Sequence, residues 1–411
     1  MKNKLLLALL ALSIAFTACK KNDDGDEPTA EDPFKLDYSN LTVEQHKKEL
    51  EKTGMDFMKK INTMPDEKFI KVMRNLNDLN LELTSNSVKK MNSFADAASN
   101  KSVSKILSSA TSTDTEKLSD SYGIYTYSLG TKSWKKTPAS DRLEINFPAY
   151  KTSTTNNAKI TMTYVSSKIN ATIDESILEL PKSSSATLLV DGLQEMKFTS
   201  AHEYKPDGTP TKTDMNLKMG SFTMAFNVAN TTEVLTNSFT FSKGTETLFS
   251  FNSTVNGTLN LGVIDDNELN ANDIKNANAS FEIMNIKFLG TLDIKAINDA
   301  HNGSEDLSGK QQNDKTVAAL NAHSQFVAIN KTSNTIIAKT NFFATESQRC
   351  YNNLIWNNST QSYIYVNECD TSYDWEPRMI FKDGSKLSFD AFKENGFSKL
   401  IDDINAFDDR F

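Results

Sequence analysis

Residues 195–204 read EMKFTSAHEY, and this stretch decides the fold class. Apolar and polar residues alternate along it, so that Met196, Phe198 and Tyr204 would share one face while charged residues lie between them. A period of two is the pattern of a β-strand with one buried and one solvated face. Such strands pair in antiparallel sheets, because parallel sheets are usually covered on both faces.

The same alternation recurs on both sides of this stretch, from residue 122 to residue 283. Turn-forming pairs such as Asp191-Gly192 and Asn256-Gly257 separate the runs. We therefore expect residues 118–300 to form a large, curved antiparallel β-sheet. With this many strands, the sheet would be a meander that curls strongly or a partly open barrel.

Helical spacing flanks the β-region, and the predicted fold class is α+β. Residues 41–117 are expected to be helical, with a Ser/Thr-rich linker at 108–114. Residues 301–411 are expected to pack on the sheet as an α+β C-terminal part. Its expected elements are a polar loop (301–315), a short helix (317–326), strands around 335–343, a hairpin (349–369), a strand at 379–381 and a final helix (389–407).

The first residues have the pattern of a secretory signal. Lys2 and Lys4 precede an apolar run over residues 5–18, which is too short to span a membrane and ends at Cys19. The run closes on Ala18 directly before the cysteine and resembles the lipobox of bacterial lipoproteins. This resemblance implies that residues 1–18 are removed and that Cys19 carries the lipid anchor, with two or three acyl chains giving stable attachment. The alternative is an ordinary signal peptide with a chance cysteine.

The residues after the cysteine, 20–28, read KKNDDGDEP. A short acidic stretch at this place resembles the surface-export signal of Bacteroidota lipoproteins, which implies a protein on the outer membrane that faces outward. From composition, residues 19–40 are expected to be a disordered tether, because they offer little apolar area to bury. The resemblance to a lipobox implies that this tether is lipidated. A chain starting near Leu41 is accordingly expected to fold with unchanged stability.

The charge balance excludes one class of partner. The full chain has 45 Lys+Arg and 53 Asp+Glu, and removing two lysines with residues 1–18 leaves 43 − 53 = −10. A net acidic protein is not expected to bind nucleic acid, because that binding depends on neutralising phosphates.

Two cysteines, Cys350 and Cys369, remain once Cys19 is lipidated. An exported chain meets an oxidising compartment, so we expect them to form a disulfide. The two runs on either side of the polar residues 358–361 are expected to form a hairpin. In it, the residue numbers of each opposing pair add up to 719. In that register Cys350 faces Cys369 and Trp356 faces Tyr363, all on one face of the ribbon.

Motifs for catalysis, phosphate binding or metal binding are not found, so we expect no cofactor, no metal and no enzyme activity. The acidic stretch 265–273 invites comparison with a calcium loop, but it lacks the central glycine and the terminal glutamate of an EF-hand. A solvated loop between strands is the favoured interpretation. The four histidines include no pair within a helical turn, which favours structural or exposed roles.

The best binding candidate is the densest aromatic region, residues 351–375. Aromatic side chains there would stack on sugar rings or contact a protein ligand, and the candidates are Trp356, Tyr363, Tyr365, Tyr373 and Trp375. Alternatively, these residues simply pack the sheet. We therefore expect a non-catalytic surface binding protein with a glycan or protein ligand.

Two other functions remain open from the sequence. The first is a carrier of a lipid or other apolar ligand, sheltered on a sheet face rich in Phe and Met, namely Phe222, Met224, Phe226, Phe239 and Phe241. The second is a hydrolase whose catalytic carboxylates cannot be singled out among many.

Overall fold

The computed structural model describes residues 32–81, 121–173, 176–231, 233–257, 274–301, 307–357, 359, 361–394 and 396–408. The predicted anchor Cys19, the acidic stretch 265–273 and the helical pattern expected after residue 81 lie outside these ranges. The described helices are α2 (Val43–Ile61), α3 (Lys68–Asp78), α7 (Ile294–His301), α8 (Gly309–His323), α9 (Phe389–Lys393) and α10 (Ser398–Asp408), with a 3-10 turn at Met64–Asp66.

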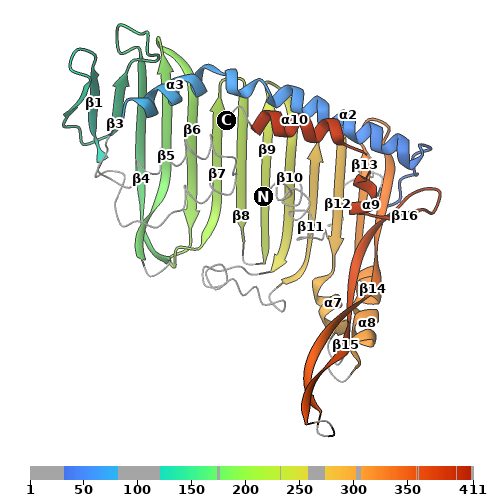
Figure 1. The fold of residues 1–411 in the computed structure, drawn as a ribbon. Helices are drawn as coiled ribbons and strands as arrows, with labels where there is room; N and C mark the ends of the chain where they lie inside the picture. The colour runs from blue at the N-terminus through green and yellow to red at the C-terminus, as the bar shows by residue number, and fades with distance from the viewer. Residues whose placement is uncertain are drawn as a thin grey trace.

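A single sixteen-stranded sheet forms the body of the protein (Figure 1). From β3 to β16 each strand pairs antiparallel with the next in sequence, so the sheet is a long meander. The strands are β1 (Gly123–Ser128), β2 (Ser133–Thr137), β3 (Leu143–Phe147), β4 (Ala158–Ile173), β5 (Ser176–Val190), β6 (Leu193–Tyr204), β7 (Pro210–Met219), β8 (Phe222–Asn230), β9 (Val234–Lys243), β10 (Glu246–Gly257), β11 (Ile274–Ile283), β12 (Ile286–Leu292), β13 (Ser324–Asn330), β14 (Thr335–Asn357), β15 (Ser362–Ile380) and β16 (Lys386–Ser388).

The sheet is open, with β16 at one edge and β2 at the other. The α+β class and the meander are confirmed, and the alternative of a partly open barrel is not adopted. One pairing departs from the antiparallel pattern. β1 lies parallel to β3 and pairs on its other side with β2, so a β1–β2 hairpin closes that edge.

Helices α2, α3 and α10 cross the strands along one face of the sheet (Figure 1). α3 buries Phe69 and Val72 against β1 and β3–β7. α2 and α10 pack Met58 and Leu400 over β8–β10, where Phe222 is fully buried. Each helix therefore contacts several strands, and the apolar half of the alternating pattern supplies the core. Within the described residues, no helix is both long enough and apolar enough to span a membrane.

Residues 33–39, which composition assigns to the tether, make specific contacts with the sheet. Leu36 is buried against β13 and β14. The Ser39 N–H donates to the Ile336 carbonyl at 2.8 Å, and the Ile336 N–H donates to the Asp37 carbonyl at 2.9 Å. The segment reads PFKLDYS, and its alternating residues Phe34, Leu36 and Tyr38 belong to one apolar cluster with β13 and β14.

The C-terminal part also differs from the prediction in its helices. The expected loop at 301–315 is helical from Gly309 onward, because Ser308 caps α8 in a reciprocal capping box with Gln311. The expected helix at 317–326 ends at His323, and Phe326 lies in β13. The expected helix at 389–407 is divided into α9 and α10, with Phe397 at a positive φ of 66° between them. The strand at 379–381 is the end of β15.

Candidate binding surface on the projecting hairpin

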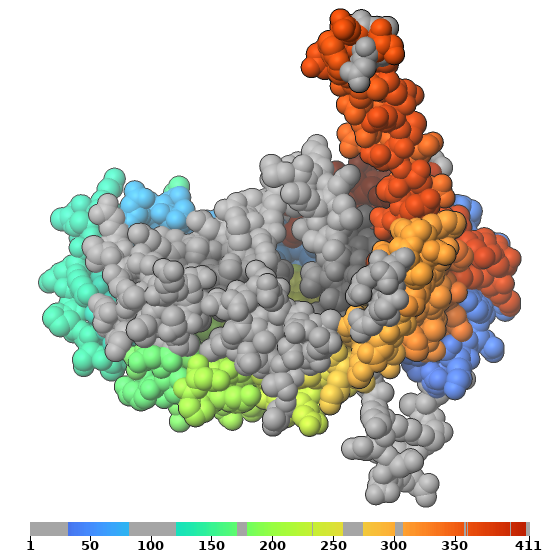
Figure 2. All heavy atoms as spheres, turned by 90° about the horizontal axis from the view of Figure 1, so that it is seen from below, coloured from blue at the N-terminus to red at the C-terminus, as the bar shows by residue number. Residues whose placement is uncertain are grey.

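Strands β14 and β15 continue far beyond their sheet neighbours. Pairing with β13 ends at Thr340, and pairing with β16 ends at Arg378. From Phe342 opposite Pro377 to Asn357 opposite Ser362, the described residues of β14 and β15 pair with each other. At about 3.3 Å per residue this ribbon is roughly 50 Å long. It projects from the body (Figures 1 and 2), and we call residues 342–377 the arm.

Helix α8 supports the base of the arm. The Asn321 side chain donates to the Phe342 carbonyl at 2.8 Å and accepts from the Phe342 N–H at 2.8 Å. The Asn313 side chain donates to the Asp374 carbonyl at 2.6 Å. These amides satisfy backbone groups that a third strand would otherwise pair. Two-stranded ribbons are marginal alone in water, so a support of this kind is expected at the base.

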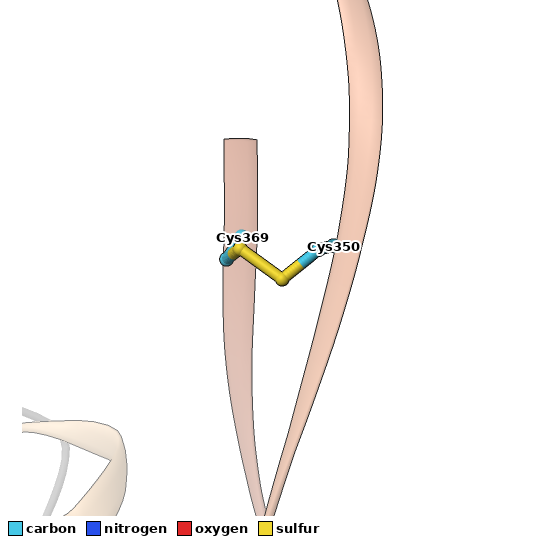
Figure 3. The surroundings of a disulfide bond; sticks show 2 residues. All are labelled: Cys350 and Cys369. Carbon is cyan, nitrogen blue, oxygen red and sulfur yellow. A yellow bond between two sulfur atoms is a disulfide. The ribbon is translucent and has the colours of Figure 1, made fainter. Parts of the chain in front are cut away.

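A disulfide joins the two strands of the arm just beyond this support (Figure 3). Cys350 and Cys369 are opposite one another, with an S–S distance of 2.07 Å. The predicted register is confirmed along the whole arm, since the residue numbers of every pair from Lys339 and Ile380 to Asn357 and Ser362 sum to 719. The disulfide therefore holds the part of the arm that lies beyond α8.

All five aromatic candidates lie on the same face of the arm as the disulfide, which we call the aromatic face. They differ in exposure. Near the tip, Trp356 is 51% exposed, Tyr363 65% and Tyr365 75%. The Trp356 and Tyr363 rings meet edge to face at 5.1 Å between centroids.

Near the base the same face is used for packing. Trp375 contacts the ring of Phe342 at 5.3 Å between centroids, and Tyr373 is half-buried. The packing interpretation of these aromatic residues thus applies at the base of the arm, and the binding interpretation stays open near its tip. Trp356, Tyr363 and Tyr365 are the most exposed of the five, whereas Tyr373 lies beside Gly309 of α8 and Trp375, still 37% exposed, packs on Phe342 at the base of the arm.

The opposite face, which we call the aliphatic face, was not singled out from the sequence. Ile355 pairs with Ile364 near the tip, and Val366 is next to them. Towards the body, acidic residues replace the aliphatic ones. Asn353 donates to the Glu368 carboxylate at 2.9 Å, and the negative charge of Asp370, which also accepts a hydrogen bond from the phenol, raises the pKa of Tyr351.

Residues 351–367 at the end of the arm contain no Asp, Glu, Lys or Arg. Charged side chains are the usual means of keeping an exposed strand pair soluble and unpaired. The end of the arm is therefore a contiguous, uncharged and partly apolar surface, which makes it the candidate binding surface. The signal in the sequence was the charge-free run itself, read together with the hairpin register.

The sheet face proposed for a carrier is filled by helices at its centre. Phe222 and Phe241 are buried beneath α2 and α10, and their rings stack at 5.6 Å between centroids. Met224 and Phe239 pack against the same cluster, while Phe226 is half-buried further along β8. A sheet face fully filled by side chains would count against a carrier, and at these residues the face is largely filled. The described surface also has two clefts of about 380 and 290 Å³, lined mainly by polar residues at 78–80 and 132–134 and on β7–β10.

Glu282 and Glu144, the most buried of the described carboxylates with displaced pKa values, belong to ion pairs. Burial alone would raise the pKa of Glu282, but hydrogen bonds from Lys331 and Lys287 lower it. Glu144 follows the same pattern with Asn146 and Arg142. A general acid needs a raised pKa, so these two groups are suited to holding strands together rather than to donating protons. Among the described residues, no group of three potential ligands could hold a metal ion.

Comparison with known proteins yields no relative for this chain. Neither protein-family models, nor curated proteins, nor solved structures contain a match.

Proposed function

We propose that the protein is a bacterial outer-membrane lipoprotein, attached through the lipids of Cys19, that faces outward and binds an extracellular ligand through the aromatic face of its arm. The anchor and the surface location are supported by the resemblance of residues 1–28 to a lipobox followed by an acidic export signal. The binding role is supported by the arm.

One observation carries the binding proposal: three exposed rings share one face of a disulfide-linked ribbon that stands away from the body. Trp356, Tyr363 and Tyr365 offer large, rigid contact area with little conformational entropy to lose. Asn352 and Asn367 are opposite one another on the same face and offer amide donors and acceptors. Rings flanked by amides suit a glycan, and the same set suits a protein ligand.

The binding test uses the full, disulfide-bonded chain on a glycan array and against candidate surface proteins. Trp356→Ala and Tyr365→Ala should each weaken binding about 30-fold, as expected when an interface anchor is truncated. Val366→Thr lies next to Tyr365 on the opposite face and is the matched control, with glycan affinity unchanged. Equal affinity of the wild type and Trp356→Ala for every ligand found would contradict the proposal.

The anchor is tested separately. Cys19→Ala should leave the signal uncut by the lipoprotein peptidase and the chain unlabelled by palmitate. Protease added to intact cells should remove the wild-type protein. Undiminished palmitate labelling of Cys19→Ala would refute the anchor, and complete protection in intact cells would place the protein in the periplasm.

A further inference from the structure

The aliphatic face of the arm has a chemistry that a sugar ligand does not use. Ile355, Ile364 and Val366 are branched aliphatic residues, which neither stack on sugar rings nor form hydrogen bonds. Ile355 is 37% exposed at the end of a projecting ribbon, and Ile364 and Val366 beside it are half-buried. A ligand of the aromatic face would leave this apolar patch uncovered.

Charge distinguishes the two faces further. Glu368, Asp370 and Asp374 lie on β15 at even positions, on the same face as Ile364 and Val366. Arg349, opposite Asp370, is the one basic residue of this face between the tip and Asp374. The net charge of the aliphatic face over this stretch is therefore 1 − 3 = −2. The same stretch of the aromatic face carries a single acid, Glu346.

From this arrangement we propose that the aliphatic face of the arm docks on a second protein, in an apolar recess bordered by Lys and Arg. The apolar tip supplies the buried centre of such an interface, and the acids next to it meet the basic rim. This contact is independent of the ligand bound by the aromatic face.

A lipid surface fits the same face less well. Seating Ile364 in a bilayer would bring Glu368 and Asp370 towards the headgroups, where anionic lipids repel them. The unpaired edges of a two-stranded ribbon would also leave backbone groups without partners in hydrocarbon. A protein recess can pair those edges and neutralise those acids.

The test places a photo-crosslinking residue at Ile364 or at Tyr365 in the full chain, in intact cells that normally produce it. The Ile364 probe should give one discrete protein adduct, and the neighbouring Tyr365 probe should give at least tenfold less of it. Glu368→Lys combined with Asp370→Lys should reduce the Ile364 adduct at least tenfold. Glu346→Lys, an equal charge reversal on the aromatic face, is the matched control and should leave the adduct unchanged.

The crosslinked peptide of the partner should carry Lys or Arg beside apolar residues. Equal adducts from both probes, an adduct insensitive to the charge reversals, the absence of a protein adduct, or flotation of the purified, unlipidated Cys19→Ala protein with phosphatidylcholine vesicles that Ile364→Asn abolishes would each overturn the inference. Glycan or protein binding that depends on Trp356 is measured separately, so the proposed function can stand when this inference fails.

Discussion

Removing the disulfide should loosen the end of the arm and leave the body almost unchanged. The bridge closes a loop of about 20 residues, which the chain-entropy model values at about 3 kcal/mol. The arm beyond Cys350 is two strands wide and exposed, so little other interaction opposes its opening. With Cys350→Ser and Cys369→Ser combined, amides in residues 349–369 should exchange with solvent up to about 100-fold faster, since 1.36 kcal/mol is a factor of ten. Residual hairpin structure in the open state would lower this factor.

The assay is native-state hydrogen exchange followed by mass spectrometry on the full chain. Peptides from β8–β10 are the internal reference, because the core under α2 and α10 does not contact the bridge. Ser347→Ala combined with Ser372→Ala removes one cross-strand hydrogen bond of 2.7 Å on the other face of the arm, and should change exchange only a few-fold. Unchanged exchange in residues 349–369 would refute the stabilising role of the bridge. A fall of many degrees in the melting temperature of the body would refute the separation of arm and body.

Three further predictions concern the body. Leu36→Ala should lower the free energy of unfolding in urea by about 2–4 kcal/mol, because Leu36 of the segment 33–39 is buried. Lys35→Ala should change it by almost nothing, because Lys35 is exposed. Equal effects would mean that the segment does not pack. Gly220→Ala should destabilise more than Gly244→Ala: both glycines have positive φ, of 56° and 59°, but only at Gly220 would an added Cβ push the Glu67 carboxylate from its hydrogen bonds with Ser221, and equal losses would show that Glu67 moves aside without cost. Burial lowers the pKa of His202, so its contribution to stability is present above a pH of about 6.5 and is lost as the pH falls. His202→Gln should therefore make the free energy of unfolding depend less on pH between pH 7 and 5. An unchanged slope would contradict this.

Local patterns determine the parts of the structure that were predicted from sequence. The register of the arm was predictable because two cysteines and one polar turn leave a single alignment, and the structure has that alignment. The strands of the body were predictable from alternation and turn residues. The side-by-side pairing of β1 and β3 was not, since parallel pairing at an edge has no signal within either strand.

Burial by distant segments explains the other failures. The segment at 33–39 has only three large apolar side chains, and its packing depends on β13 and β14, which follow it by about 300 residues. The carrier face was identified correctly as an apolar sheet face, but its cover comes from helices at both ends of the chain. At the candidate site, the division of five aromatic residues into exposed and packed ones depends on where α8 ends its contact with the arm.

The modest hydrophobic content of the chain follows from its architecture. Only one face of the sheet is covered by the described helices, so alternate residues of most strands stay polar. Across β8–β11, one row on the other face reads Asn227, Ser238, Asn252 and Ser280. An exposed apolar residue is therefore unusual in this sheet, and it requires an explanation where it occurs. The arm concentrates such residues at Leu354, Ile355, Trp356, Tyr363 and Tyr365, in a part of the chain that adds little to the core. Stability of the body does not account for them, and contact with another molecule is the explanation that the proposed function offers.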